Sequence, residues 1–297
     1  MTRPVLVTGA NGQLGTALAR AGKEWTLHTV SRPEFDFEHL DAIPGIFATL
    51  NPRAVINAAA YTAVDAAESD AAAAFRANRD GPAVLARLCR ETGTPLIHIS
   101  TDYVFDGTKG SPYLESDPVA PLGIYGASKL AGEEEVLQAG VRTLVLRTSW
   151  VISPTGRNFV RTMLAARQKT NRLRVVADQR GRPTSASDLA AAILAILHRV
   201  ECTGWQEGYA GVFHIAGSGE TTWHGLATAI FEEAARHGLT APEIVPIATS
   251  DWPTPARRPP DSRLDCTRLA EVFGLRLPLW RESLGPIIDE ILCAGTR

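Results

Sequence analysis

The order of apolar and polar positions along the chain predicts strands that alternate with helices. Apolar residues recur at helical spacing between short β-rich runs, which is typical of βαβ units and of a parallel sheet joined by right-handed crossovers. The nearly continuous apolar character of the strands indicates a sheet that is covered on both faces. The predicted strands are 4–9, 25–31, 53–60, 95–101 and 143–150, and the predicted helices are 13–22, 38–50, 65–92 and 124–139.

After about residue 150 this alternation becomes less regular. The pattern predicts helices over 158–169, 185–200 and 222–238, strands over 172–179 and 211–217, and an ordered loop rich in proline and arginine over 250–265. No linker separates two domains. We therefore predict an α/β fold with a Rossmann-like, doubly wound parallel sheet in residues 1–150, to which 172–200 returns. A smaller, intercalated C-terminal lobe would be formed mainly by 151–297.

Composition and charge narrow the class of protein. Of the 297 residues, 45% are apolar and 21% are charged, which predicts a soluble globular protein. The net charge of -2 argues against general nucleic-acid binding. The longest apolar helical stretch, 189–197, is too short to cross a membrane. The chain enters a strand pattern at once, and its four cysteines are widely spaced, which favours reduced thiols and a cytoplasmic location.

A glycine-rich turn follows the first predicted strand. The stretch "TGANGQLG" places Gly9, Gly12 and Gly15 between this strand and the first helix. Glycines at such a turn let the backbone approach a pyrophosphate closely, and the N-terminus of a helix favours an anion. In a βαβ context this spacing predicts a dinucleotide site.

The end of the second predicted strand bears on the choice of cofactor. An acidic residue that binds the ribose 2′-hydroxyl of NAD is common there, but this chain has Ser31 and Arg32. Arg32 could hold a 2′-phosphate, which favours NADPH, although a solvated arginine at a strand end is the simpler alternative. Asp36 follows closely and could contact the ribose or adenine, so NADH stays possible.

A tyrosine and a lysine lie four positions apart in "GIYGASKLAG". Tyr125 and Lys129 fall on one face of the predicted helix 124–139. The chain has 30 basic residues, of which only four are lysines, so a lysine here stands out. A nearby ammonium favours the phenolate and is expected to lower the pKa of Tyr125, which would suit proton transfer to a carbonyl oxygen. The alternative is an ordinary helix pair, with Tyr125 packed and Lys129 solvated.

Thr101 ends the fourth predicted strand, in "HISTDYVFDG". Ligands of open α/β sheets bind beyond the carboxyl ends of the strands, where a hydroxyl group can donate a hydrogen bond to a reacting oxygen. Together with the glycine turn, Thr101, Tyr125 and Lys129 form the set expected for hydride transfer to or from a carbonyl group.

At this point the chain resembles a known family, the extended short-chain dehydrogenase/reductases. Within it, the resemblance is to the branch that reduces the C4 ketone of dTDP-linked 6-deoxysugars. The matching stretches follow one another over nearly the whole chain: "GANGQLG", "VINAAAYTAVDAAE", "STDYVFDG", "IYGASKLAGE", "LRTSWV", "NFVRTML", "VVADQRGRPTSASDLA" and "DWPTPARRPPDSRLD".

The resemblance implies roles for the matching residues. Tyr125 would donate the proton, Lys129 would also anchor the nicotinamide ribose, and Thr101 would orient the carbonyl group. The residues implied at the cofactor are Gly9, Asn11, Gly12, Gln13, Leu14, Ser31, Arg32, Asp36, Phe37, Ala59, Ala60, Tyr61, Thr62, Tyr125 and Lys129. The residues implied at the dTDP-sugar are Thr101, Asp102, Trp150, Asn158, Arg258 and Arg263. For the two arginines, a solvated basic loop is the alternative, and for Trp150 a place in the core.

Two departures from the wider family refine the expected activity. Related dehydratases carry an Asp-Glu pair after the strand-end threonine, whereas here Tyr103 follows Asp102, which favours plain ketone reduction. Some relatives bind a metal through carboxylates at a dimer interface. This chain has Ala17 and Ser187 at two of those positions and keeps only Glu290, so we expect no metal.

Three functions remain open from the sequence. The first is NADPH-dependent reduction of dTDP-4-dehydro-6-deoxy-L-mannose to dTDP-L-rhamnose by a monomer or homodimer. The second is another nucleotide-sugar ketoreductase or epimerase with the same fold. The third is a non-catalytic regulatory subunit, like a close relative of these reductases that partners a methionine adenosyltransferase. The presence of Thr101, Tyr125 and Lys129 weakens this third reading.

Overall fold

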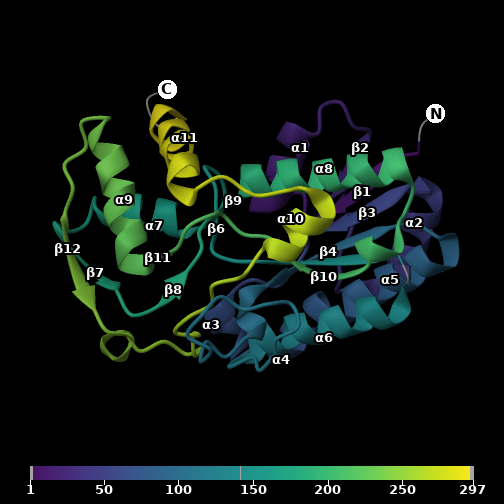
Figure 1. Cartoon of the computed structure of the whole chain (residues 1–297), viewed down its shortest axis with the longest axis horizontal. Helices are drawn as coiled ribbons and strands as arrows, with labels where there is room; N and C mark the ends of the chain where they lie inside the picture. Colours follow the sequence, from purple (N-terminus) through teal and green to yellow (C-terminus); the bar gives the residue numbers. More distant parts are fainter. Residues whose placement is uncertain (1–2, 141, 295–297) are drawn as a thin grey trace.

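The computed structural model describes residues 3–140 and 142–294, and its centre is a six-stranded parallel sheet (Figure 1). The strand order is β10-β5-β4-β3-β1-β2, and each neighbouring pair runs parallel. The strands are β1 (Val5–Thr8), β2 (Leu27–Val30), β3 (Ala54–Asn57), β4 (Leu96–Thr101), β5 (Thr143–Thr148) and β10 (Gly211–His214). The predicted doubly wound α/β sheet is confirmed.

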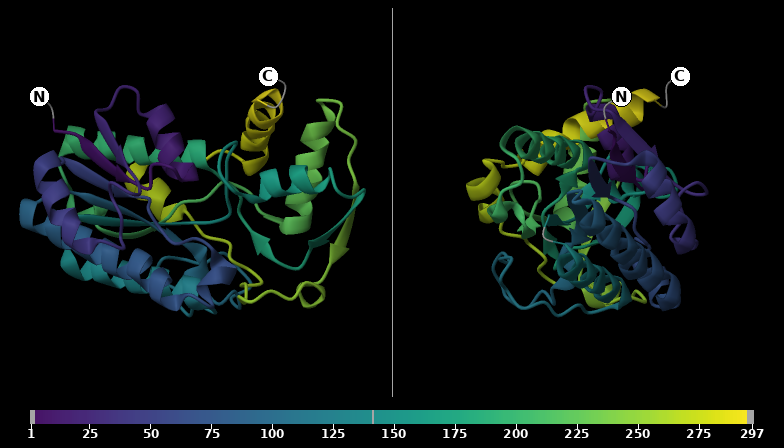
Figure 2. Two further views of the ribbon diagram at one scale, coloured as in Figure 1. Left: turned by 180° about the vertical axis from the view of Figure 1, so that it is seen from behind. Right: turned by 90° about the vertical axis from the view of Figure 1, so that its right-hand side faces the viewer.

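Helices cover both faces of this sheet because its central strands are apolar on both sides (Figure 2). Along β1, Val5 and Val7 pack in one core cluster, and Leu6 between them packs in another. The first cluster includes residues of α1 (Gln13–Ala21), α8 (Ala186–Thr203) and α10 (Thr267–Phe273). The second includes residues of α2 (Ile43–Leu50), α5 (Gly81–Thr92) and α6 (Ile124–Ala139).

One long predicted helix, 65–92, is wrong as a continuous element. The structure divides it into α3 (Val64–Ala67), α4 (Ala71–Phe75), the π-helical segment η2 (Arg76–Asp80) and α5. Asp70 begins α4 by accepting a hydrogen bond from the backbone N–H of Ala73, and a proline stands in the first turn of α5. The predicted helix 38–50 likewise begins as a 3-10 turn, η1 (Leu40–Ala42), before α2.

The second lobe packs three helices around a small two-stranded sheet. Its core gathers apolar residues of α7 (Phe159–Ala166), α9 (Trp223–Ala235) and α11 (Trp280–Ala294). They pack over β7 (Arg172–Val176), which pairs in parallel with β12 (Glu243–Ile247). Shorter elements connect these parts: β6 (Val151–Ile152), β8 (Arg180–Gly181), β9 (Thr184–Ser185), β11 (Thr221–Thr222), η3 (Asp102–Val104), η4 (Glu207–Tyr209) and η5 (Thr249–Asp251). The sequence pattern had not indicated β12, α10 or α11.

The path of the chain crosses between the two lobes more than once. The helix α8 lies against α1, and β10 extends the large sheet beyond β5, so both complete the first lobe (Figure 1). In contrast, β7 pairs with β12 in the second lobe, so only the α8 part of the predicted return of 172–200 reaches the large sheet. Within the residues described, no helix is long and apolar enough to cross a membrane.

Candidate active site

A cavity of about 680 Å³ opens at the carboxyl ends of the parallel strands, between the two lobes. Residues of the first lobe and of the second lobe line it together, which is the position expected for a ligand of an open α/β sheet. The predicted site residues on its wall are Gln13, Leu14, Ala60, Thr62, Thr101, Asp102, Tyr125, Lys129, Trp150 and Arg258.

The glycine turn before α1 has the tight geometry that a dinucleotide site needs. Gly9 has a φ of 76°, and a Cβ atom there would lie 2.8 Å from the backbone of Ala58 and Ala59. A Cβ atom at Gly15 would lie 2.2 Å from the Gly9 carbonyl oxygen. Gly12 caps α1 without a side chain, so the first N–H groups of the helix face outward toward an incoming anion. These residues therefore fit the pyrophosphate of a nicotinamide cofactor.

The polar residues near the end of β2 lie beside this turn. The Asn11 amide donates a hydrogen bond to the Ser31 hydroxyl over 2.9 Å, and the Arg32 side chain is exposed. Asp36 accepts a hydrogen bond from the backbone of Glu38. Phe37 is buried in the core, where its ring lies against Gly81. The cofactor roles of these residues stay predictions.

The loop after β3 carries Ala59 to Thr62 and is held by a buried asparagine. Asn78 accepts from the Tyr61 backbone N–H over 2.8 Å, and donates to the Tyr61 carbonyl over 3.0 Å and to the Ser128 hydroxyl over 2.9 Å. It thereby joins the predicted cofactor loop to the helix of Tyr125 and Lys129. Sequence reasoning missed Asn78, although a weak helix former inside an alanine-rich helical stretch was a usable signal.

Tyr125 lies in the first turn of α6, beside the end of β4. Burial raises the pKa of its phenol to about 12, a hydrogen bond with Thr101 opposes this rise, and the charge of Asp102 adds to it. The expectation of a lowered pKa for Tyr125 is therefore wrong for this site, because burial of the phenol is the largest effect on it. The phenol stays protonated at neutral pH, which suits a proton donor.

Lys129 is buried one helical turn further along α6, with 2% of its surface exposed. Its ammonium donates a hydrogen bond to the Ile99 carbonyl oxygen over 2.6 Å. Burial lowers the pKa of Lys129 to about 8, and the charge of Glu133 acts in the opposite direction. This lysine is therefore not a solvated partner in an ordinary helix pair.

Asp102 is the most unusual group on the cavity wall, because it is a carboxyl group that is only 1% exposed. Its Oδ1 atom accepts a hydrogen bond from the Thr101 hydroxyl over 3.1 Å, and Ser262 donates another. Its Oδ2 atom has no partner among the residues described. Burial raises the pKa of Asp102 to about 7 despite these hydrogen bonds.

Trp150 forms an aromatic wall of the cavity, as the sequence predicted, and its backbone φ is 45°. Its ring stacks on Trp223 with centroids 3.5 Å apart and planes 7° apart. Gly181 leaves the space for this ring, since a Cβ atom there would lie 2.3 Å from it. The partner ring from α9 could not be foreseen from local sequence.

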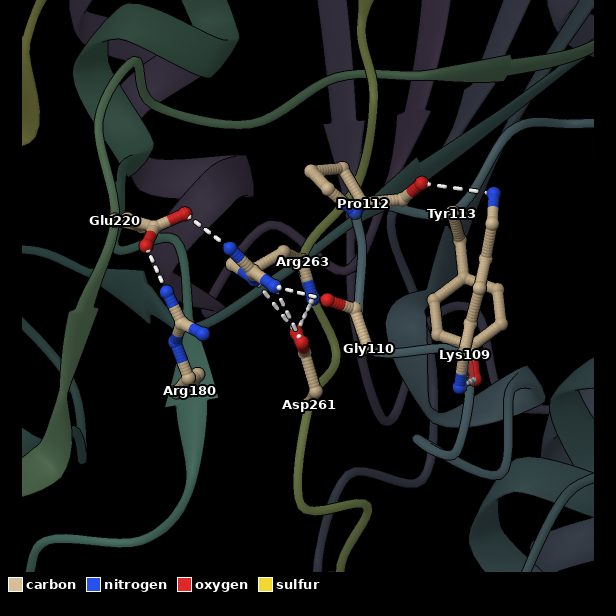
Figure 3. A network of polar contacts seen from close by, with 8 residues as sticks. All are labelled: Lys109, Gly110, Pro112, Tyr113, Arg180, Glu220, Asp261 and Arg263. Carbon is tan, nitrogen blue, oxygen red and sulfur yellow. Dashed lines mark hydrogen bonds and ion pairs between the residues drawn. The ribbon is translucent and has the colours of Figure 1, made fainter.

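The structure separates the two arginines of the proline-rich loop. Arg258 lines the cavity and makes a two-pronged ion pair with Asp65 of α3, at 2.8 and 3.1 Å. Arg263 is buried away from the cavity wall and contacts Asp261 and Glu220, while Glu220 also binds Arg180 (Figure 3). Its guanidinium donates to both carboxylates and to the Gly110 carbonyl oxygen, and Arg263 is absent from the cavity wall. Its contact with the substrate stays a prediction.

Asn158 also has a structural position rather than one on the cavity wall. It begins α7 by accepting from the backbone N–H of Arg161, and its amide donates to the carbonyl oxygens of Ser153 and Thr155. Glu290, the one carboxylate retained from the metal-binding pattern, pairs with Arg20 over 2.6 Å. Among the residues described, no three His, Cys, Asp or Glu side chains form a group that could hold a metal.

The large parallel sheet and the three side chains at its edge define the class of protein. It is an extended short-chain dehydrogenase/reductase, with a glycine turn at β1 and a Thr, Tyr and Lys set between β4 and α6. A family model described as "RmlD substrate binding domain" matches residues 2–293. The chain belongs to this family, that of the dTDP-4-dehydrorhamnose reductases.

Individual relatives are similar to this chain over almost its whole length. The dTDP-4-dehydrorhamnose reductase of Burkholderia thailandensis is 44% identical over 296 residues, covering 97% of this chain and 99% of the relative. The crystal structure of such a reductase from Clostridium acetobutylicum has a TM-score of 0.90 at 35% identity, covering 97% of this chain and 99% of the other. One from Bacillus anthracis, in complex with NADP, has a TM-score of 0.89 at 32% identity, with 98% and 100% coverage.

Proposed function

We propose that this protein reduces the C4 ketone of dTDP-4-dehydro-6-deoxy-L-mannose with NADPH and forms dTDP-L-rhamnose. The observation that carries this proposal is the contact between Tyr125 and Thr101 beside buried Lys129, on the wall of a cavity large enough for a sugar nucleotide. The names of its relatives support the same substrate. Because the reaction consumes NADPH and a nucleotide sugar, we place it in the cytoplasm.

The side chains of the site divide the work of carbonyl reduction. When bound, NADPH supplies the hydride that the sugar C4 atom receives. The Thr101 hydroxyl orients the C4 oxygen, and Tyr125 gives this oxygen its phenolic proton as negative charge develops on it. The cationic Lys129 stabilises the electron-rich phenol oxygen during this transfer, and it has two further N–H donors for a ribose hydroxyl. A proton from solvent then restores Tyr125.

The substrate side of the cavity favours reduction over elimination. Asp102 is followed by Tyr103, whose ring meets Tyr125 edge to face at 5.6 Å, so no Asp-Glu pair follows Thr101 to remove water from the sugar. We assign Trp150 to the apolar face of the sugar. We assign Arg258 to the diphosphate, because it reaches the cavity with its guanidinium already oriented by Asp65.

The cofactor end of the site fits either nicotinamide cofactor, with NADPH favoured. Arg32 is exposed at the end of β2 beside Ser31 and Asn11, where a 2′-phosphate would be bound. The solved relative from Bacillus anthracis holds NADP. An Arg32→Ala variant should raise the KM for NADPH about tenfold or more and leave the KM for NADH nearly unchanged.

The decisive experiment supplies the purified protein with the dTDP-ketosugar, made in place by upstream enzymes, and with NADPH. Loss of NADPH absorbance together with dTDP-L-rhamnose identified by NMR is the expected result. Epimerised ketosugar with no loss of NADPH would instead assign an epimerase. A product with the opposite configuration at C4 would assign a different ketoreductase. No reaction with active upstream enzymes would overturn the proposed function.

A further inference from the structure

A buried ion pair lies directly behind the proposed active site. Glu133 of α6 and Arg147 of β5 are 1% and 4% exposed, and the guanidinium binds the carboxylate at 2.6, 2.9 and 3.1 Å. The guanidinium also lies 5.1 Å from the centre of the Phe105 ring. One nitrogen of Arg147, Nη1, has no partner among the residues described.

Such a pair is a poor source of stability. Removing both charges from water costs several kcal/mol per ion, and an apolar pair of the same size is often at least as stable. The unpartnered nitrogen makes the balance less favourable still. The position of this pair therefore calls for a reason other than stability, and the reason lies in what surrounds it.

Glu133 connects the two elements that carry the proposed catalytic residues. It accepts a hydrogen bond from the hydroxyl of Ser100, which precedes Thr101 on β4. One turn earlier on α6, Lys129 donates to the carbonyl of Ile99, which precedes Ser100. Neighbouring residues of α6 thus hold neighbouring residues of β4. This arrangement fixes Tyr125 and Lys129 on the helix relative to Thr101 at the strand end.

The negative charge of Glu133 also affects the pKa of Lys129. Lys129 shares the cavity wall with Tyr125, Asp102 and Tyr103, and its charge acts on the buried His98. Burial holds the pKa of His98 well below its ordinary value, so it is neutral at physiological pH. Arg147 is a cation, but its guanidinium is paired with the carboxylate of Glu133. Of these groups, Glu133 opposes the effect of burial on the pKa of Lys129.

We propose that Glu133, oriented by Arg147, is a positioning residue of the active site that keeps Lys129 cationic and holds β4 in register with α6. This inference rests on the proposed function, since it assigns to Glu133 an effect on Lys129 during ketone reduction. Glu133 itself stays behind the cavity wall and touches neither substrate nor cofactor.

The test compares the pH dependence of kcat/KM in variants that separate charge from fold. Glu133→Gln keeps the size of the side chain but removes its charge, so Lys129 should lose its proton at lower pH. The basic limb of the profile, where kcat/KM falls as the pH rises, should then shift to lower pH by on the order of one unit. Turnover at pH 8 should fall several-fold. Glu133→Asp keeps the charge and should restore the position of the limb.

Two further variants keep the result interpretable. Val136→Ala lies on the same helix in the core and should lower the melting temperature without moving the limb. If Glu133→Gln does not fold, the double variant Glu133→Gln/Arg147→Met removes both charges. Its basic limb should still move to lower pH, but by less, because the Arg147 cation is lost as well. Asp102 titrates in the same way in all these variants. Differences between their pH profiles therefore report on Lys129.

The possible outcomes distinguish failure of the proposed role of Glu133 from failure of the proposed function. A wild-type protein that does not reduce the ketosugar refutes the proposed function. An active wild type whose basic limb is the same in Glu133→Gln, Glu133→Asp and Val136→Ala refutes the role of Glu133 alone. A downward shift in Glu133→Gln that is absent in Glu133→Asp supports it.

Discussion

Three titratable side chains meet at the end of β4, of which Asp102 and Lys129 are buried and Tyr125 is half-buried, and the loss of solvent pushes each of them toward its neutral form. The pKa of Asp102 rises to about 7, that of Tyr125 rises to about 12, and that of Lys129 falls to about 8. Neutral pH is therefore close to the pKa of Asp102 and below the pKa values of Tyr125 and Lys129. Tyr125 holds its proton there, and Lys129 is still mostly charged, which is the combination that a proton donor to an alkoxide needs.

Asp102 should make the stability of the protein depend on pH. Its pKa is higher in the folded state than the ordinary value of 3.8, so its stabilising effect is complete below pH 4 and is lost as pH rises toward 7. Above pH 7 a buried carboxylate remains. Asp102→Asn should therefore raise the free energy of unfolding at pH 8 by roughly 2–4 kcal/mol relative to wild type. This gain should shrink toward zero near pH 4.

Urea unfolding at pH 4, 6 and 8 measures this effect. The matched control is Asp106→Asn, a carboxyl group in the next loop whose pKa is lowered by its hydrogen bonds with the backbone of Thr108 and with Tyr113. That variant should lose stability at pH 8 rather than gain it. An Asp102→Asn variant with the same pH dependence as wild type would contradict the raised pKa.

Removing the proposed proton donor should abolish turnover but not binding. Tyr125→Phe keeps the ring that meets Tyr103 and removes the hydroxyl that contacts Thr101. We expect kcat to fall by about 10²–10⁴-fold. The Kd for NADPH, measured by fluorescence titration, should change less than about threefold. Full turnover in this variant would contradict the assignment of the donor.

At the scale of elements, close backbone packing fixes the site. The helix α6 carries Tyr125 and Lys129, and it lies so close to its neighbours that two of its glycines have no room for a side chain. A Cβ atom at Gly126 would lie 2.3 Å from the Tyr103 carbonyl oxygen. A Cβ atom at Gly132 would lie 1.9 Å from the carbonyl oxygen of Asn78, in the π-helical segment η2.

Gly132→Ala should therefore be strongly destabilising, although alanine is the better helix former. We expect a loss of about 2–4 kcal/mol, because backbone rather than a side chain must move. Gly45→Ala is the matched control, since Gly45 lies within α2 with open space around it. It should be neutral or stabilise by up to about 1 kcal/mol. Equal melting temperatures for the two variants would show that α6 and η2 are less tightly packed.

The sequence predicted the elements better than their breaks and their partners. Apolar runs located the strands near Val5, Leu96 and Thr143, because parallel strands that are covered on both faces need nearly continuous apolar residues. The π-helical turn at Arg76–Asp80 could not be foreseen, since it reflects packing against Gly132 of another helix. Local composition equally could not place Arg263, which contacts the nearby Asp261 and the distant Glu220 (Figure 3).

Over the whole molecule, the cavity depends on a chain that leaves the first lobe and returns to it. Its wall takes Tyr125 and Lys129 from the first lobe and Trp223 and Arg258 from later segments. Motifs near the strand ends indicated the first group, because the edge of a parallel sheet is predictable. The second group was only partly predictable, since its position depends on how the lobes pack.

Because α8 returns to the first lobe, the predicted domain 1–150 lacks a helix that covers its sheet. This helix buries four large apolar side chains, Leu189, Ile193, Ile196 and Leu197, in the core cluster that also holds residues of α1. Each is worth about 1.5–3 kcal/mol, so together they contribute roughly 6–12 kcal/mol, comparable to the whole stability of a typical domain. A fragment of residues 1–150 would lack this contribution and would expose the corresponding face of its sheet.

We therefore expect the fragment 1–150 to lack a cooperative unfolding transition and to bind no NADPH, although it carries the glycine turn, Tyr125 and Lys129. Circular dichroism and fluorescence titration measure the two properties. Co-expression with the fragment 151–297 should restore both, because α8 and β10 can then complete the sheet from a separate chain. A fragment 1–150 that unfolds cooperatively and binds NADPH by itself would show that the first lobe is an independent domain. In that case α8 would cover a face that is already stable.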